Sequence, residues 1–306
     1  MSGFRPRFFV SLDHALSVGD MHGLELSLTA GDSKHASRVL RLREGDECEV
    51  VVKLMGAVRA TEAAGTGAAV AGRVPNAAGA AETGAAVAGR VPNAAGAAVY
   101  AATVSAVADP VRVRLGALLE STVEGPEYRV EVGLAQALTR PSLIDHVIEK
   151  GTEVGASSFL LVHATASPSH PGLARPDRIE RWRRIAREAA KQSRRTVVPI
   201  VDATGLLAEA LEHPMVTGAL SLVLEPGAST SLQQALLDWD GASTAPGDAP
   251  WRVTLWVGPE GGWAPAELQS FSAAGIASVR LGRSVLRTET AGPVAVAAAR
   301  LTLRDW

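Results

Sequence analysis

The sequence LWVGPEGG, at residues 255–262, is an apolar run that ends in a glycine-rich turn. Pro265 follows it, and proline is favoured at the first position of a helix. A strand, a glycine turn and a helix in this order form the ligand crevice at the carboxyl end of the sheet in many α/β proteins. The glycine spacing matches neither G-x-G-x-x-G nor a P-loop, which disfavours a nucleotide phosphate as the ligand. Taken alone, the segment is also compatible with a plain tight turn.

The sequence LGRSVLRTETA, at residues 281–291, is a second glycine-bearing segment, and it also follows an apolar strand. It brings Arg287, Glu289 and two threonines together directly before an expected helix. We expect Thr290 to cap that helix. Arg287 lies close enough to Glu289 to pair with it, within one chain or across a dimer. Such a polar cluster at the mouth of an apolar helix indicates a site, and a capping cluster alone is the alternative.

From about residue 125, strand-like and helix-like segments alternate along the chain. Strands are expected at 128–135, 158–162, 197–201, 219–224, 252–257 and 276–281. Helices are expected at 141–154, 176–194, 204–212, 231–238, 265–274 and 291–303. This alternation is typical of an α/β fold with a parallel sheet.

The part before residue 125 has a different pattern of short strands. They are expected at 7–10, 47–52, 100–107 and 111–119, with one helical segment near 31–41. Several short strands separated by turns predict a small β-barrel. We therefore expect two domains, residues 1–124 and 125–306.

Residues 63–98 form an unusual insertion in the first domain. The sequence TGAAVAGRVPNAAGAA occurs at 66–81 and again, identically, at 83–98. An exact copy indicates a recent duplication, since repeat architectures stack several divergent units. The segment is rich in Ala and Gly and has little to bury. We expect a flexible excursion between two strands, with no function of its own.

The composition excludes several classes of protein. The chain has 306 residues, 47% of them apolar, and a net charge of −2, so any contact with nucleic acid depends on a local patch. The one cysteine, Cys48, excludes a disulfide framework and fits a cytoplasmic location. We expect it to be a half-buried strand residue. Neither a signal peptide nor a membrane span is expected, and the seven histidines show no metal-ligand spacing.

The expected helix 176–194 has two different faces. Ile179, Trp182, Ala186 and Ala189 share one face at helical spacing. The other face carries five basic residues, which are Arg178, Arg181, Arg184, Arg187 and Lys191. Charges of one sign favour contact with RNA phosphates. A solvated surface is the alternative.

The two glycine-bearing segments together resemble the RsmE family of 16S rRNA uridine-N3 methyltransferases, in the SPOUT superfamily. Further segments match the family in the right order, and they lie at 5–10, 35–46, 136–138, 149–155, 181–193 and 199. The resemblance therefore spans nearly the whole chain except 63–98 and the loop near 240–250. The chain departs from the family at 139–143, where only Arg140 keeps the basic charge, and at 164–167.

The resemblance implies a fold, a cofactor and partners. The fold is an N-terminal PUA-like β-barrel followed by a SPOUT α/β domain with a trefoil knot. The cofactor is S-adenosylmethionine, and the partners are a second copy of the chain and the 16S rRNA of the small ribosomal subunit. The implied cofactor residues are Leu224, Glu225, Gly258, Gly261, Leu281, Gly282, Leu286, Arg287 and Thr290. The residues assigned to RNA are Arg7, Arg38, Arg41, Arg140 and Arg187.

The implied chemistry assigns roles to two residues. Uridine N3 carries a proton at neutral pH, and Glu289 is a candidate to accept it. Arg287 would stabilise negative charge on the uracil oxygens. The alternative for Glu289 is that it only anchors its loop. Two rival functions stay open, a knotted methyltransferase acting on tRNA or large-subunit rRNA and a non-catalytic RNA-binding protein of the same fold.

Overall fold

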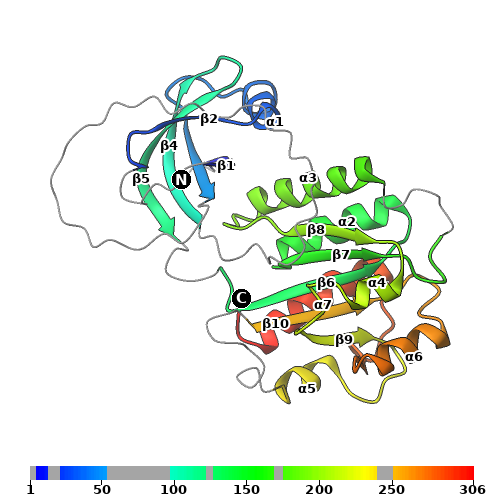
Figure 1. Ribbon diagram of the computed structural model, residues 1–306. Coiled ribbons are helices and arrows are strands. Elements are labelled where there is room, and N and C mark those ends of the chain that lie inside the picture. Colours follow the sequence, from blue (N-terminus) through cyan, green and yellow to red (C-terminus); the bar gives the residue numbers. More distant parts are fainter. Residues whose placement is uncertain (1–4, 13–20, 54–96, 122–126, 169–174, 240–250) are drawn as a thin grey trace. The chain divides into compact units, whose positions relative to one another are not determined.

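The computed structural model describes residues 5–12, 21–53, 97–121, 127–168, 175–239 and 251–306 (Figure 1). The chain divides into two compact units, residues 1–127 and 128–306, and the division falls three residues after the one expected from the sequence. Each unit has its own hydrophobic core. Most of the insertion expected at 63–98 lies outside the described residues. Its last two residues, Ala97 and Ala98, are buried at the start of a strand.

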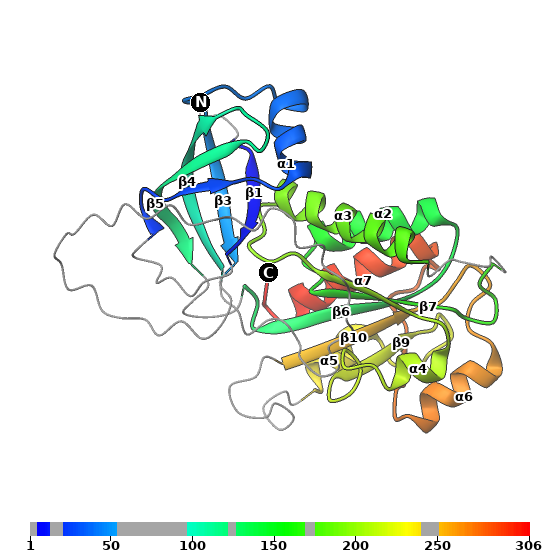
Figure 2. The same ribbon diagram turned by 45° about the horizontal axis from the view of Figure 1, so that its top comes forward.

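The first unit is a curled, mixed five-stranded sheet (Figure 2). Its strands, in spatial order, are β1 (Arg7–Ser11), β3 (Glu47–Lys53), β4 (Ala97–Ala106), β5 (Arg112–Ser121) and β2 (Glu25–Ser27). Among these described strands, β1 and β3 pair in parallel, and the other neighbouring strands pair antiparallel. The helical segment expected near 31–41 is α1 (Ala30–Lys34), which continues into a π-helical turn, η2 (His35–Val39).

Arg7 is buried in this sheet, which corrects its assignment to the RNA surface. It lies opposite Glu49 on the neighbouring strand, and its Nε and Nη2 both donate to Glu49 Oε2, at 3.0 and 2.8 Å. The side chains of Arg7 and Glu49 are 4% and 5% exposed. A buried charge is tolerated when it is paired and hydrogen-bonded. A pattern of basic residues in the sequence does not show which of them has such a partner.

Cys48 is fully buried in β3, where the sequence suggested only partial burial. Burial, with a smaller effect of the nearby Glu49 charge, raises the pKa of its thiol to about 12. Because the reactive form is the thiolate, we expect no modification of the native protein by a disulfide reagent at pH 8. Full reaction is expected once the first unit is unfolded in urea. Rapid, stoichiometric labelling of the native protein would contradict the burial of this residue.

The second unit has a six-stranded sheet in which all pairs are parallel. The spatial order is β11 (Ala277–Val279), β9 (Leu220–Leu224), β10 (Trp251–Val257), β6 (Val130–Ala137), β7 (Ser158–Val162) and β8 (Ile200–Thr204). The helices are α2 (Pro141–Glu153), α3 (Pro176–Gln192), α4 (Leu207–Leu211), α5 (Leu232–Leu237), α6 (Pro265–Ala273) and α7 (Thr288–Thr302). The expected α/β class is confirmed.

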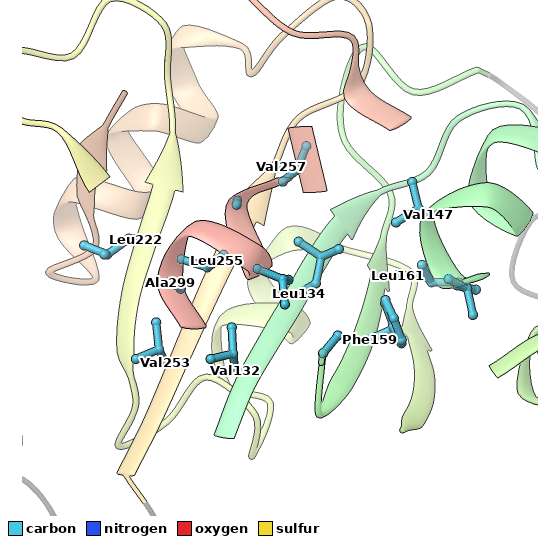
Figure 3. Packing of buried hydrophobic residues seen from close by; sticks show 14 of the residues in the cluster. Val132, Leu134, Val147, Phe159, Leu161, Leu222, Val253, Leu255, Val257 and Ala299 are labelled. Atoms are coloured by element: carbon cyan, nitrogen blue, oxygen red, sulfur yellow. The ribbon is translucent and has the colours of Figure 1, made fainter. Parts of the chain in front are cut away.

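Both faces of this sheet are covered, because successive side chains of a strand point to opposite faces. On one face, Val132, Leu134 and Leu255 pack with α2, α3, α5 and α7, and Figure 3 shows part of this core. On the other face, Ala135, Trp256 and their neighbours pack with α4 and α6. Strands buried on both faces explain why these segments are continuous apolar runs in the sequence.

One expected strand lies three residues later than predicted, at β8 instead of 197–201. The β-branched residues Thr196, Val197 and Val198 favour a strand by propensity. Pairing begins only at Ile200, which lies opposite the first residue of β7, Ser158. The position of the partner strand therefore overrides the local preference.

The amphipathic character expected for α3 is confirmed, with one correction. Trp182, Ala186 and Ala189 are buried. Lys191, expected on the basic face, is 7% exposed, and its Nζ donates to Glu188 Oε1 at 2.8 Å. None of the helices in the described ranges has the length and apolar character that a membrane span requires.

Candidate cofactor site

A pocket of about 600 Å³ lies at the carboxyl edge of the parallel sheet. Its walls come from the segments that follow β9, β10 and β11 and from the start of α2. The strand order reverses between β6 and β10. From β6 the chain continues to β7 and β8 on one side, whereas β10 and β9 lie on the other side. Ligands of open α/β sheets bind at the carboxyl edge where the strand order reverses in this way.

The pocket combines apolar walls with a few charged groups. Apolar side chains come from Leu143, Leu224, Val257, Trp263, Leu281 and Leu286, among others. Charged side chains come from Arg140, Glu225, Glu260, Arg287 and Glu289. Small-molecule sites typically show this composition in a volume of roughly 300–1,000 Å³. The pocket is therefore of the size and chemistry that a cofactor requires.

The glycine-rich turn after β10 packs closely against the side chains of Trp263 and Ala166. Gly262 has a φ of +72°, and its N–H donates to the carbonyl oxygen of Pro259 at 2.9 Å. A Cβ at Gly258 would lie 3.1 Å from Nε1 of Trp263. A Cβ at Gly261 would lie 3.0 Å from the Cβ of Ala166. The glycines thus let the turn pack closely while it forms one wall of the pocket.

Glu267 fixes the end of this turn. It is 7% exposed, and its carboxylate accepts from the N–H of Ala264 at 2.7 Å and from the N–H of Thr165 at 2.8 Å. The first contact satisfies a free N–H at the start of α6. The second joins α6 to the segment after β7. Glu267 therefore has a structural role outside the pocket.

Arg280 ties the segments after β9 and β11 together. Its backbone N–H donates to the carbonyl oxygen of Thr230 at 2.9 Å, and its Nη1 donates to the carbonyl oxygens of Ala228 and Ser229. In the same region the N–H of Glu225 donates to the carbonyl oxygen of Val279 at 2.9 Å. Leu224, Glu225, Leu281 and Gly282 are thereby held on one side of the pocket.

The start of α7 differs from the expectation. The helix begins at Thr288, and its N-cap residue Arg287 makes no capping hydrogen bond through its side chain. Thr290 is the third residue of the helix, so it is not the cap, and its side chain is exposed. Glu289 is half-buried in the same turn. A carboxylate there interacts favourably with the positive end of the helix dipole.

Three polar groups connect the interior of the sheet to two walls of the pocket. Nε2 of the buried Gln136, on β6, donates to Thr288 Oγ1 at 2.9 Å. Thr288 Oγ1 donates to the carbonyl oxygen of Gly258 at 2.6 Å. Thr288 and Gly258 both line the pocket, whereas Gln136 is fully buried and does not line it.

The structure brings most of the expected cofactor residues together. Leu224, Glu225, Gly258, Leu281, Gly282, Leu286 and Arg287 all line the pocket. Gly261 and Thr290 are not among the lining residues, although their neighbours on both sides are, so their assignment to the cofactor stays a prediction. Arg140, which was assigned to RNA, also lines the pocket. Sequence reasoning missed Trp263 and Thr288, although both lie directly beside or within the two quoted segments.

The other residues assigned to RNA are distributed over both units. Arg38 and Arg41 are exposed in the first unit, and Arg187 is exposed on α3. Within the part of the chain that the structure describes, no three His, Cys, Asp or Glu side chains are grouped so that they could hold a metal ion.

A largely apolar pocket at the carboxyl edge of a parallel sheet defines an α/β protein that binds a small molecule there. The chain belongs to the RNA methyltransferase family, whose domain model matches residues 126–300. Ribosomal RNA small subunit methyltransferase E of Mycobacterium bovis is 37% identical over 185 residues, 59% of this chain and 67% of the relative. The protein of that name from Synechocystis is 37% identical over 183 residues, 59% of this chain and 56% of the relative.

Solved structures share the fold. A methyltransferase from Legionella pneumophila, in complex with S-adenosylmethionine, has a TM-score of 0.68 at 20% identity. Ribosomal RNA small subunit methyltransferase E from Neisseria gonorrhoeae, bound to S-adenosylmethionine, has a TM-score of 0.66 at 23% identity. Each comparison covers 98% of both chains. At these identities the solved structures support the fold alone, and the family rests on the sequence matches.

Proposed function

We propose that this protein is an S-adenosylmethionine-dependent methyltransferase that modifies N3 of a uridine in the 16S rRNA of the small ribosomal subunit. The observation that carries the proposal is the pocket, because the segments 258–263 and 281–289 meet in it. The names and bound cofactor of the relatives support the same activity.

The residues of the pocket fit this cofactor. Leucine and valine side chains offer an apolar surface for the adenine ring, and the carboxylates Glu225, Glu260 and Glu289 offer acceptors for hydroxyl and amino groups. The indole N–H of Trp263 is buried without a hydrogen-bond partner among the described residues. S-adenosylmethionine supplies a methyl group activated by a positively charged sulfur. Carboxylates near that charge favour its binding.

The chain's own residues would position the base and manage its proton. Glu289, in the first turn of α7, would accept the N3 proton of the uridine. Arg287, one residue earlier, would stabilise the negative charge that develops on the uracil oxygens. Arg140 also lines the pocket and offers a second guanidinium to the substrate.

Finer features follow from the same proposal. We propose a PUA-like barrel for the first unit, a trefoil knot for the second, a homodimer as the assembly and the cytoplasm as the location. Arg38, Arg41 and Arg187 would bind RNA phosphates, since their side chains are exposed.

Two measurements test the proposal. Titration calorimetry of the purified protein is expected to give one S-adenosylmethionine site per chain. Small-subunit rRNA from a strain that lacks this protein is expected to lose one N3-methyluridine. If the methylation of small-subunit rRNA is unchanged and that of tRNA or large-subunit rRNA changes, the RNA that changes is the substrate. Absence of cofactor binding would favour a non-catalytic RNA-binding protein.

A further inference from the structure

We propose that Gln136 and Thr288 are positioning residues that hold the cofactor pocket in its binding-competent form. The proposal rests on the proposed function and concerns residues that the two glycine-bearing segments do not explain. Gln136 is 0% exposed, outside the pocket, and near the carboxyl end of β6. Its amide is nevertheless two hydrogen bonds away from a pocket-lining carbonyl group.

The chemistry of the partners fixes the direction of these hydrogen bonds. The carbonyl oxygen of Ala137 can only accept, and it lies 3.2 Å from Nε2 of Gln136, so the amino group of the amide faces it. The same amino group donates to Thr288 Oγ1. The hydroxyl proton of Thr288 is then free to donate to the carbonyl oxygen of Gly258, which can also only accept.

The consequence is a fixed separation between two walls of the pocket. Gly258 opens the turn after β10, and Thr288 opens α7. Glycine has the widest choice of backbone conformations, so its carbonyl group needs a partner to keep one orientation. The hydroxyl of Thr288 provides that partner, and Gln136 holds the hydroxyl in place from within the sheet.

Close packing leaves this arrangement little room to change. A Cβ at Gly292 would lie 2.9 Å from Cδ2 of Leu134 and 3.1 Å from Oε1 of Gln136. Helix α7 can therefore lie this close to β6 because residue 292 is glycine. The Oε1 atom of Gln136 is buried, and no donor among the described residues meets it. A buried amide with an unsatisfied oxygen is costly, and the two hydrogen bonds donated by its amino group offset part of that cost.

The direct test is to measure the affinity for the cofactor in variants that lack the amide of residue 136 or the hydroxyl of residue 288. Thr288→Val and Gln136→Met are each expected to raise the Kd for S-adenosylmethionine about tenfold, as expected for the loss of one buried hydrogen bond. Thr288→Ser, which keeps the hydroxyl, is expected to restore most of the affinity. Thr302→Val, at the far end of the same helix, is the matched control and is expected to bind normally.

Two further readouts separate positioning from general stability. Gln136 acts through Thr288, so losing both costs no more than losing one. The Kd of the double variant Gln136→Met/Thr288→Val is therefore expected not to exceed the larger Kd of the two single variants. In Gln136→Glu, the carboxylate cannot donate, whereas its protonated form can. Affinity is therefore expected to recover as the pH falls from 8 to 5, while the unmodified protein shows no such recovery.

The outcomes distinguish this inference from the proposed function. If the unmodified protein binds no S-adenosylmethionine, the proposed function fails. If it binds, and Thr288→Val and Gln136→Met bind equally well, only the positioning role fails. Additive losses in the double variant would also overturn it, as would a Gln136→Glu variant that binds weakly at pH 8 and equally weakly at pH 5.

Discussion

Replacing Arg300 by methionine is expected to lower the free energy of unfolding of the second unit by about 3–5 kcal/mol, the range for breaking a buried ion pair. Arg300 is 0% exposed in α7. Its Nη1 lies 2.8 Å from Oδ2 of Asp305, whose side chain is 9% exposed. The methionine variant leaves this carboxylate buried with less compensation, because a thioether cannot donate a hydrogen bond.

Arg300 also satisfies backbone groups from distant parts of the chain. Its guanidinium donates to the carbonyl oxygen of Val130 at 2.6 Å and to that of Gly155 at 2.7 and 3.1 Å. It lies 3.6 Å from the centroid of the Tyr128 ring. Asp305 in turn accepts from the N–H groups of Arg129 and Val130. The end of the chain is thereby fixed to the first strand of the sheet.

The composition of the chain gives a selective measurement. All six tryptophans belong to the second unit, at residues 182, 239, 251, 256, 263 and 306. Urea unfolding followed by tryptophan fluorescence therefore reports that unit. The matched control is Arg184→Met on the exposed side of α3, for which a change within about 0.5 kcal/mol is expected. Equal stabilities of Arg300→Met and the unmodified protein would contradict the structural role of this network.

The alternation of strands and helices was predictable because each follows a local pattern. A strand buried on both faces is a continuous apolar run, and a surface helix has a 3.6-residue period. Arg300 shows what such patterns cannot reveal. Its partners Val130 and Gly155 are far from it in the sequence, and basic residues are on the surface in most proteins. Arg7 and Lys191 were assigned to exposed faces for the same reason.

The site was predictable as two segments and not as individual contacts. Thr288 and Thr290 both suit a helix start, and only the structure shows that α7 begins at Thr288. That shift of a few residues places Thr290 on the exposed side. Gln136 had no signal as a positioning residue, since its role depends on strand β6 lying beside β10 and under α7.

Glu289→Gln is expected to lower the rate of methyl transfer at pH 7 by about 10²–10⁴-fold, the usual contribution of a general base. Glutamine keeps the size and hydrogen-bonding oxygen of glutamate but cannot accept the N3 proton at neutral pH. Glu289 lines the pocket from the first turn of α7. We expect a much smaller change in the Kd for S-adenosylmethionine, which calorimetry measures directly.

A control separates this role from simple anchoring at a helix terminus. Glu209 lies in the first turn of α4, is exposed, and does not line the pocket. Glu209→Gln removes a negative charge from the first turn of another helix, and its effect on stability is expected to be within about 1 kcal/mol. Its rate of methyl transfer should remain that of the unmodified protein.

The pH dependence of the rate decides between the two roles of Glu289. If Glu289 accepts the proton, the glutamine variant depends on uridine that has already ionised, so its rate should rise about tenfold per pH unit above neutrality, until N3 itself is largely ionised. The unmodified protein, which has its own base, should show a flatter profile. An anchoring role predicts instead a loss of rate that is the same at every pH and accompanies a lower melting temperature. A parallel pH profile for Glu289→Gln and the unmodified protein would therefore leave Glu289 as an anchor and place the proton acceptor elsewhere.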